Sequence, residues 1–339
     1  MIIDHKSHKV EANKLEGHQA DARSDTTLGL VLDAFLGGAS NATSLLVVFT
    51  VVRALCLCIL IVIIASISFH RTAQAADTTT IPQRIVSLGP GVTKKLFLLG
   101  AGDKVVANTT YCTYPKGAES KEKIGNVTLV NIEKILSLKP DLVLAIGLTP
   151  PRQVEKMRKL GLRVVRFYRP ESFFMLCKDF IRLGELIGCP EKAETIIHQA
   201  KQGVAAVQKR VAALSKKRVF VQIGVKPLFT ATRNTLVNDY IRLSGGENIA
   251  DHEGSGVYSR EKVLNADPEF IFVTTMGTSG DSRKKAQEKE AWLKYPSLKA
   301  TKHHNIHVLN SDQVCSPTPG EFVEMLTYMA SIIHPEEGA

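Results

Sequence analysis

One short motif occurs twice in this chain, and the repeat constrains the fold more than any other feature. The stretches Asn131–Ala145 and Ser259–Val273 lie 128 residues apart and share Glu-Lys-(Ile/Val)-Leu, followed at one fixed spacing by proline, an acid and an apolar run. Ile132, Ile135 and Leu136 fall at helical intervals, and the proline ends that helix. The apolar run that follows is typical of a strand buried in a parallel sheet. The repeat therefore predicts two similar lobes, each built on a helix–turn–strand unit.

Each copy of the motif also carries one acid that we expect to be exposed, Glu133 in the first and Glu261 in the second. An acid in the first turn of a helix interacts favourably with the helix dipole, so both glutamates could serve the scaffold alone. The alternative is a functional contact made once by each lobe. The repeat by itself leaves both interpretations open.

The first 75 residues differ from the rest of the chain. Residues 1–44 are polar, whereas Leu45–Phe69 is apolar except for Arg53, and Ala73–Ala75 gives a small-x-small cleavage pattern. Residues 1–75 are therefore predicted to be an N-terminal extension plus a signal peptide that is cleaved near Ala75–Ala76. A retained transmembrane anchor is the alternative, since the apolar run is long enough to span a bilayer, but Arg53 near its middle would be costly.

The length of polar sequence before the apolar run is unusual for an exported protein. This suggests that translation starts near Val51 or Val52. The first 75 residues carry as many basic as acidic residues, so the formal net charge of +10 belongs wholly to the exported part. Such a charge suits anionic ligands or surfaces and also aids solubility. Nucleic acid is not an expected partner, because basic and aromatic residues do not cluster together.

Four cysteines remain after the predicted cleavage: Cys112, Cys177, Cys189 and Cys315. Export permits disulfides, but the sequence does not give their connectivity. Cys177 and Cys189 stand at opposite ends of one predicted helix, about 18 Å apart at the helical rise per residue, which is too far for a bond between them.

Short apolar strands and amphipathic helices alternate from Ile81 onward, which indicates an α/β fold. After Pro190, apolar residues recur at three- and four-residue steps as far as Leu214 and predict one long helix. The resulting organisation is an N-terminal α/β lobe at 76–188, a connecting helix at 189–215 and a C-terminal α/β lobe at 216–339. A long surface helix within one lobe is the alternative for the middle segment.

Aromatic residues and one cysteine occupy loops next to the predicted strands. In α/β sheets ligands gather at the carboxyl ends of strands, so we expect these side chains to line a cleft between the lobes and to stack on a large flat ligand. The candidate ligand-binding residues are Tyr111, Tyr114, Tyr168, Phe229, Tyr258 and Cys315.

Enzymatic motifs are missing from the sequence. It contains no phosphate-binding loop, dinucleotide fingerprint or Gly-x-Ser-x-Gly turn, and nothing pairs a nucleophile with a base. His303, His304 and His307 flank a predicted strand without a spaced cysteine or acid partner, so we predict no metal site there. The sequence thus favours a binding protein over an enzyme.

Several motifs together resemble one family over most of the exported part, from about Arg84 to the last helix. They are similar to the periplasmic cobalamin-binding proteins of ABC importers and, more broadly, to the helical-backbone group that also carries ferric siderophores and haem. The motifs are Lys216–Thr230, Gly245–Ile249, Ser259–Glu261 and Lys139–Val143.

The resemblance implies two similar Rossmann-like α/β lobes joined by a single long backbone helix, with a shallow ligand cleft between them and little hinge motion. It implies that Glu133 and Glu261 dock onto arginines of the importer's transmembrane subunits. It also places Tyr111 where a cleft tyrosine of the family contacts the corrin.

Five positions depart from the family's pattern. Val127 and Ser255 stand near points where the cobalamin binders have tryptophans, and Lys94 replaces an acid in the first helix. Ser244 replaces a cysteine that some members have. The tyrosine ligand of the haem binders falls close to Asn126, which disfavours haem. These departures bear on the ligand more than on the family.

The sequence therefore predicts a monomeric periplasmic solute-binding protein without a cofactor of its own. Its ligand would be a small-molecule metal chelate, cobalamin or another cobalt corrinoid, and its partner the transmembrane subunits of an ABC importer. A ferric siderophore or other ferric chelate is the alternative ligand. An envelope metal chaperone or enzyme that uses Cys112 and Cys315 across the cleft is the alternative of another class.

Overall fold

The computed structural model describes residues 53–54, 57, 59, 80–275 and 282–335. The two lobes lie within one compact unit, Thr79–Ala339, which is described by itself. Apart from residues 53–54, 57 and 59, the predicted leader and the alternative anchor fall outside the described residues, as does the cleavage site. Among the helices that are described, none is both long and apolar enough to cross a membrane.

The first lobe is built on a five-stranded parallel sheet in the order β3-β2-β1-β4-β5. Its strands are β1 (Ile85–Ser87), β2 (Val105–Asn108), β3 (Glu122–Lys123), β4 (Leu142–Ile146) and β5 (Val164–Phe167). The strand order reverses at β1, which lies between β2 and β4. Loops that leave such a reversal point diverge and open a crevice at the carboxyl edge of the sheet.

Helices cover both faces of this sheet. On one face the core contains α3 (Pro90–Leu98), α7 (Phe173–Ile187) and the first half of α8 (Pro190–Val211). On the other face it contains α5 (Ile132–Ser137) and α6 (Pro151–Lys159). The short helix α4 (Lys116–Glu119) follows a cis peptide bond at Tyr114-Pro115.

The second lobe repeats this arrangement around a sheet in the order β10-β9-β6-β7, with β8 also paired to β6. Its strands are β6 (Lys217–Gly224), β7 (Phe229–Thr230), β8 (Gly246–Asn248), β9 (Phe270–Val273) and β10 (Ile306–Val308), of which β7 alone is antiparallel to its neighbour. One face is covered by α9 (Leu236–Leu243) and α14 (Pro319–Ile333). The other is covered by α10 (Arg260–Ala266), α11 (Ser282–Leu293) and α12 (Lys299–Lys302), while α13 (Ser311–Cys315) follows β10.

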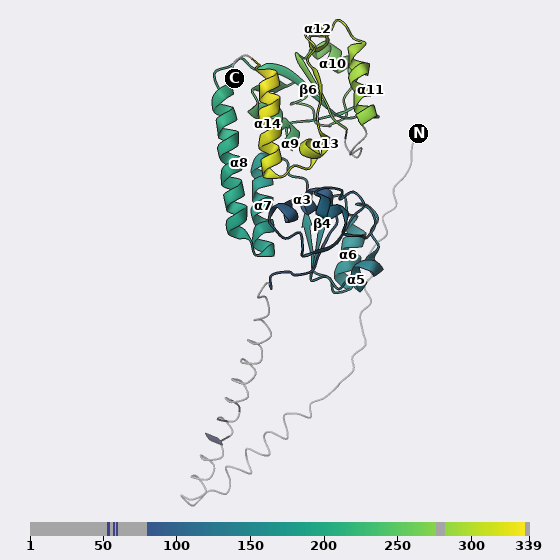
Figure 1. Cartoon of the computed structure of the whole chain (residues 1–339), viewed down its shortest axis with the longest axis vertical. Helices are drawn as coiled ribbons and strands as arrows, with labels where there is room; N and C mark the ends of the chain where they lie inside the picture. The colour runs from purple at the N-terminus through teal and green to yellow at the C-terminus, as the bar shows by residue number, and fades with distance from the viewer. Residues whose placement is uncertain (1–52, 55–56, 58, 60–79, 276–281, 336–339) are drawn as a thin grey trace, which may run out of the picture. The chain divides into compact units, whose positions relative to one another are not determined.

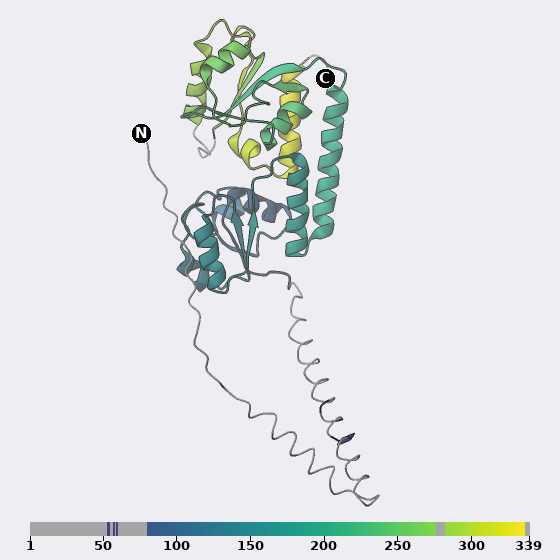
Figure 2. The same cartoon turned by 180° about the vertical axis from the view of Figure 1, so that it is seen from behind.

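Helix α8 belongs to the cores of both lobes (Figures 1 and 2). Ala193 and Ile197 pack in the first core, whereas Val204, Val207 and Val211 pack in the second. The chain can start this helix sharply, because Gly188 ends α7 in the left-handed conformation at φ 79° and Pro190 occupies the first turn of α8. The predicted fold of two similar α/β lobes on one long helix is confirmed, although the helix ends at Val211 rather than at 215.

Direct contacts also join the lobes beside α8. The Lys94 ammonium on α3 lies 2.7 Å from the Glu321 carboxylate on α14, and the Lys94 side chain is only 5% exposed. The ring of Phe173 stacks on that of Phe322 at 4.7 Å, and the Phe173 N–H donates to the Asp239 carboxylate. The lysine that departs from the family's pattern thus has a structural role, as one half of an ion pair between the lobes.

Candidate functional site

The two copies of the repeated motif have the same local structure. Asn131 and Ser259 cap α5 and α10 by accepting the N–H groups of Lys134 and Lys262, at 2.9 and 3.2 Å. Each motif then passes through a residue with positive φ immediately before its proline, 46° at Lys139 in the first copy and 44° at the equivalent aspartate in the second. The similarity in sequence therefore reflects one backbone conformation used twice.

The acid after each proline serves the scaffold. The Asp141 carboxylate accepts the backbone N–H groups of Gln83 and Arg84 just before β1, and Glu269 accepts that of Arg218 in β6. Each carboxylate thus satisfies backbone donors at the start of the neighbouring strand. This part of the motif is explained by folding alone.

The glutamates of the motif have a different environment. Glu133 and Glu261 are exposed in the first turns of their helices. Hydrogen bonds from its own backbone N–H and from Ser259 hold the pKa of the Glu261 carboxyl below its usual value. The lysine that follows each glutamate is bound to another acid, Lys134 to Glu122 and Lys262 to Glu253. Neither glutamate is neutralised by its neighbouring lysine, so each copy of the motif presents one exposed carboxylate.

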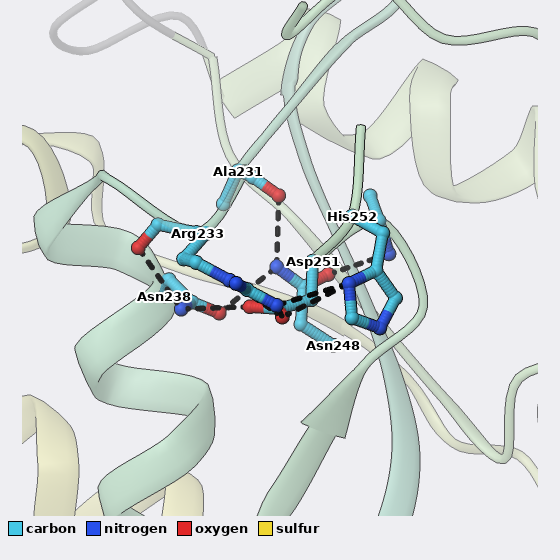
Figure 3. A network of polar contacts seen from close by, with 7 residues as sticks. Ala231, Arg233, Asn238, Asn248, Asp251 and His252 are labelled. Carbon is cyan, nitrogen blue, oxygen red and sulfur yellow. Dashed lines mark hydrogen bonds and ion pairs between the residues drawn. The ribbon is translucent and has the colours of Figure 1, made fainter. Parts of the chain in front are cut away.

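A polar network fixes the start of the loop that leads to Glu261 (Figure 3). The amide of Asn248 donates to the Ala231 carbonyl at 2.8 Å and to the side chain of Asn238 at 3.0 Å. Asn238 in turn donates to Asp251, which also accepts two bonds from the Arg233 guanidinium. This bonding holds the pKa of the Asp251 carboxyl below its usual value, chiefly through the Arg233 hydrogen bond.

The end of the same loop is bound to β7. Tyr258 donates its N–H to the Leu228 carbonyl at 2.9 Å, and Thr230 donates to the Gly256 carbonyl at 2.8 Å. Phe229, a candidate ligand contact, lies between these two bonds. The segment that carries Phe229 is therefore hydrogen-bonded directly to the segment that leads into the α10 cap.

Four of the predicted ligand-binding aromatics are available at the surface, Tyr114 among them at 63% exposure. Tyr111 follows β2 and is 50% exposed, Tyr168 follows β5 and is 65% exposed, and Phe229 in β7 is 37% exposed. The Arg166 guanidinium lies 5.2 Å from the Tyr168 ring centroid and donates to backbone carbonyls of the 146–149 turn, which includes Thr149. The turn after β4 and the aromatic after β5 are thus fixed to each other, a contact that the sequence did not indicate.

Tyr114 and Tyr258 lie in different surroundings. Tyr114 lines a groove of about 690 Å³ between α3, α8 and the start of α14. Tyr258 is only 9% exposed, packs 5.7 Å from the Phe220 ring centroid and belongs to the core under α10. Burial raises the pKa of its hydroxyl. The expectation that Tyr258 lines an open cleft is wrong, because this residue is a core residue of the second lobe.

The two cysteines of the chaperone alternative do not form a site. Cys112 is fully buried, with its sulfur 3.2 Å from the Thr93 hydroxyl and 3.3 Å from that of Thr109. Burial raises the pKa of Cys315 to about 11, opposed by the positive charges of Arg169 from the first lobe and Lys285 from the second. Cys315 therefore lies where the lobes approach each other, but Cys112 is inaccessible, which contradicts the chaperone alternative.

The remaining cysteines and the histidines add no metal site. The cysteines Cys112, Cys177, Cys189 and Cys315 are all free thiols. Over residues 80–275 and 282–335 no three histidine, cysteine or acidic side chains are grouped so as to hold a metal ion.

Comparisons with known proteins agree with this architecture. A vitamin B12-binding protein of Yersinia pseudotuberculosis is 36% identical over 206 residues, which cover 60% of this chain and 71% of the relative. An uncharacterized ABC transporter substrate-binding lipoprotein of Bacillus subtilis is 31% identical over 263 residues, covering 75% of this chain and 81% of the relative.

Solved structures give the same result. The periplasmic vitamin B12-binding protein of Vibrio cholerae superposes with a TM-score of 0.63 at 29% identity, covering 75% of this chain and 97% of that one. A periplasmic haem-binding protein of Roseiflexus sp. RS-1 superposes with a TM-score of 0.65 at 25% identity, covering 75% and 98%. The periplasmic binding protein family matches residues 85–313. The chain therefore belongs to the periplasmic binding protein family and is a substrate-binding protein of an ABC transporter, not an enzyme.

Proposed function

We propose that this protein captures a cobalt corrinoid, cobalamin in the first place, and delivers it to the transmembrane subunits of an ABC importer. The observation that carries the importer role is the pair of exposed carboxylates, Glu133 and Glu261. Their two helices are capped in the same way, and in each the lysine after the glutamate is paired with another acid. Two equivalent acids on two similar lobes suit a partner with two similar subunits. Such charges steer encounter and set register more than they raise affinity.

The choice of ligand rests on the relatives and on the exposed aromatics. Relatives at 36% and 29% identity are named vitamin B12-binding proteins. Tyr111, Tyr168 and Phe229 offer faces for stacking on a large flat ring system. A ferric chelate is the second candidate, because Val127 and Ser255 stand near points where the cobalamin binders have tryptophans, and a solved neighbour at 25% identity is a haem-binding protein.

Export by a cleavable signal peptide is part of the same proposal. Similar proteins are periplasmic or lipoproteins, and the small-x-small pattern at Ala73–Ala75 supports cleavage near Ala75–Ala76. N-terminal sequencing of the exported protein would test this. A mature chain that retains residues 45–69 would replace the signal peptide with an anchor.

Ligand titration tests the ligand assignment. The purified protein would be titrated with cyanocobalamin, a ferric hydroxamate siderophore and haemin, with visible absorbance and tyrosine fluorescence as readouts. We expect saturable binding of cyanocobalamin and a corrinoid spectrum in protein purified from corrinoid-fed cells. Saturable binding of the ferric siderophore alone would transfer the assignment to the second candidate.

A paired substitution tests the docking assignment. Glu133→Ala combined with Glu261→Ala should leave ligand affinity intact but abolish stimulation of the importer's ATPase. A matched control is Glu155→Ala combined with Glu290→Ala, which removes one exposed acid from α6 and one from α11. Full stimulation by the first variant would show that docking uses other residues.

A further inference from the structure

A basic surface lies along α6 in the first lobe. Arg152, Lys156 and Lys159 are exposed and spaced by four and three residues, so they share one side of the helix. Together with Arg158 and Arg166 they line a depression of about 670 Å³, in which Glu155 is the acid among the lining residues. We call this surface the α6 basic face.

Most of this positive charge is not cancelled by the contacts that the cations make. Arg158 donates to the Val164 carbonyl, and Arg166 donates to carbonyls of the turn before α6. Backbone carbonyls satisfy donors without neutralising their charge. Lys159 lies 3.9 Å from Glu155, but both side chains are more than half exposed, and such pairs contribute little. The α6 basic face therefore keeps a net positive charge.

Exposed leucines lie near the N-terminal end of the same helix, in the loop that leads into α5 and in the turn before α6. Gln153 in α6 donates to the Thr128 carbonyl at 2.9 Å and accepts the Val130 N–H at 3.2 Å, which fixes α6 to the loop that leads into α5. Leu129 in that loop is 68% exposed, and Leu148, just before α6, is 59% exposed. Cations and protruding leucines thus occur side by side.

The second lobe has a weaker version of the same arrangement. Helix α11 follows β9 as α6 follows β4, and both helices lie on the sheet face opposite α8 (Figure 1). Arg283 and Lys294 line a depression of about 520 Å³ on α11, together with Glu290. Each lobe therefore carries a helix with exposed cations next to the helix that bears the motif glutamate.

We propose that the α6 basic face binds the anionic phospholipid headgroups of a membrane surface, so that the protein rests on the bilayer beside its permease. The apolar side of α6 packs into the core, so the helix would not insert into the bilayer; its exposed cations would be attracted to anionic headgroups, and the leucines in the adjoining loops would add apolar contact. Each basic residue close to an anionic surface strengthens binding by about fivefold. The cations spread along two helical turns instead of converging on one point, which suits a layer of phosphates better than a single small anion.

A vesicle assay tests this proposal without ligand or permease, so its outcome is independent of the proposed function. The exported protein, purified without detergent, would be sedimented with vesicles of phosphatidylcholine alone or of phosphatidylcholine with phosphatidylglycerol. The variant is Arg152→Gln/Lys156→Gln/Lys159→Gln. The matched control is Lys192→Gln/Lys201→Gln/Lys209→Gln, which removes the same charge from exposed positions on α8.

We expect the wild type to bind vesicles that contain phosphatidylglycerol, and to bind them less tightly as salt is raised. The α6 variant should bind on the order of 100-fold more weakly, while the α8 control stays close to wild type. Circular dichroism would verify that both variants fold. Absence of wild-type binding would overturn the proposal, and so would equal losses in the two variants. Normal binding of the α6 variant to the vesicles that contain phosphatidylglycerol would overturn it as well.

Discussion

Replacing Glu321 with glutamine should destabilise the protein more than replacing its partner, Lys94, with methionine. The Lys94 ammonium is 2.7 and 2.9 Å from the two carboxylate oxygens, and its other acceptor, the Asp312 carbonyl, is 3.5 Å away. Removing one charge of a buried pair costs about 3–5 kcal/mol, because the other charge stays buried without compensation. Lys94 is 5% exposed and Glu321 18%, so we expect about 3 kcal/mol for Glu321→Gln.

Replacing Lys94 with methionine leaves the Glu321 carboxylate behind, which is better solvated than the Lys94 ammonium. After Lys94→Met, the Glu321 carboxylate keeps its 2.7 Å bond from the Thr318 N–H and its partial contact with water. Losing the hydrogen bonds to the ammonium should then cost about 1–2 kcal/mol. Glutamine at 321 preserves the capping box at the start of α14. The loss of stability in Glu321→Gln therefore reports the lost negative charge and not a lost helix cap.

Urea unfolding of the wild type, both single variants and the double variant would measure these values. The double variant should be no less stable than Glu321→Gln alone, because it buries no unpaired charge, and the coupling energy should reach about 2 kcal/mol. A constant slope against urea concentration would show that the unfolded state is unchanged. Equal losses in the two single variants, or additive losses in the double variant, would refute the reasoning.

Three further predictions concern the candidate site. Tyr168→Ala should weaken cyanocobalamin binding by about tenfold, through loss of ring stacking, whereas Tyr258→Phe should leave affinity unchanged; absorbance titration measures both. Hydrogen bonds from its own backbone N–H and from Ser259 lower the pKa of Glu261, so its carboxylate keeps its charge to lower pH than it would without them; Ser259→Ala should therefore move the acid loss of importer ATPase stimulation to higher pH, which ATPase assays over a pH series would measure. The Cys315 thiol has a pKa of about 11, so iodoacetamide labelling followed by mass spectrometry should detect slow reaction at neutral pH and faster reaction only as pH rises toward that value.

Much of the fold follows from local patterns in the sequence. Amphipathic periodicity located α8, with Gly188 and Pro190 marking its start, and the apolar runs located β4 and β9. The end of α8 differs from the prediction, because periodicity continues to Leu214 while the backbone already turns after Val211, with a Leu214 N–H to Val211 carbonyl bond. Helix ends depend on such local bonds, which a periodic pattern does not reveal.

The candidate site was less accessible to prediction. Tyr111, Tyr168 and Tyr258 all occur in loops beside strands, yet the first two are exposed and the third is in the core. The sequence could not distinguish them, because the direction of a loop side chain depends on which backbone the loop pairs with. Tyr258 pairs with Leu228, and its ring packs on Phe220.

The sequence by itself determined that the chain has two similar lobes, and that each presents one acid in the first turn of a helix. Periodicity, proline placement and helix caps depend on residues close together in the chain, so they can be recognised in the amino-acid sequence. Only the tertiary structure decided which charged side chains form ion pairs and which stay exposed for a partner. Folding brings Lys134, Lys262 and Lys94 into ion pairs with other acids and leaves Glu133 and Glu261 exposed. Interactions between charges depend on their distances in space, which only the folded structure gives.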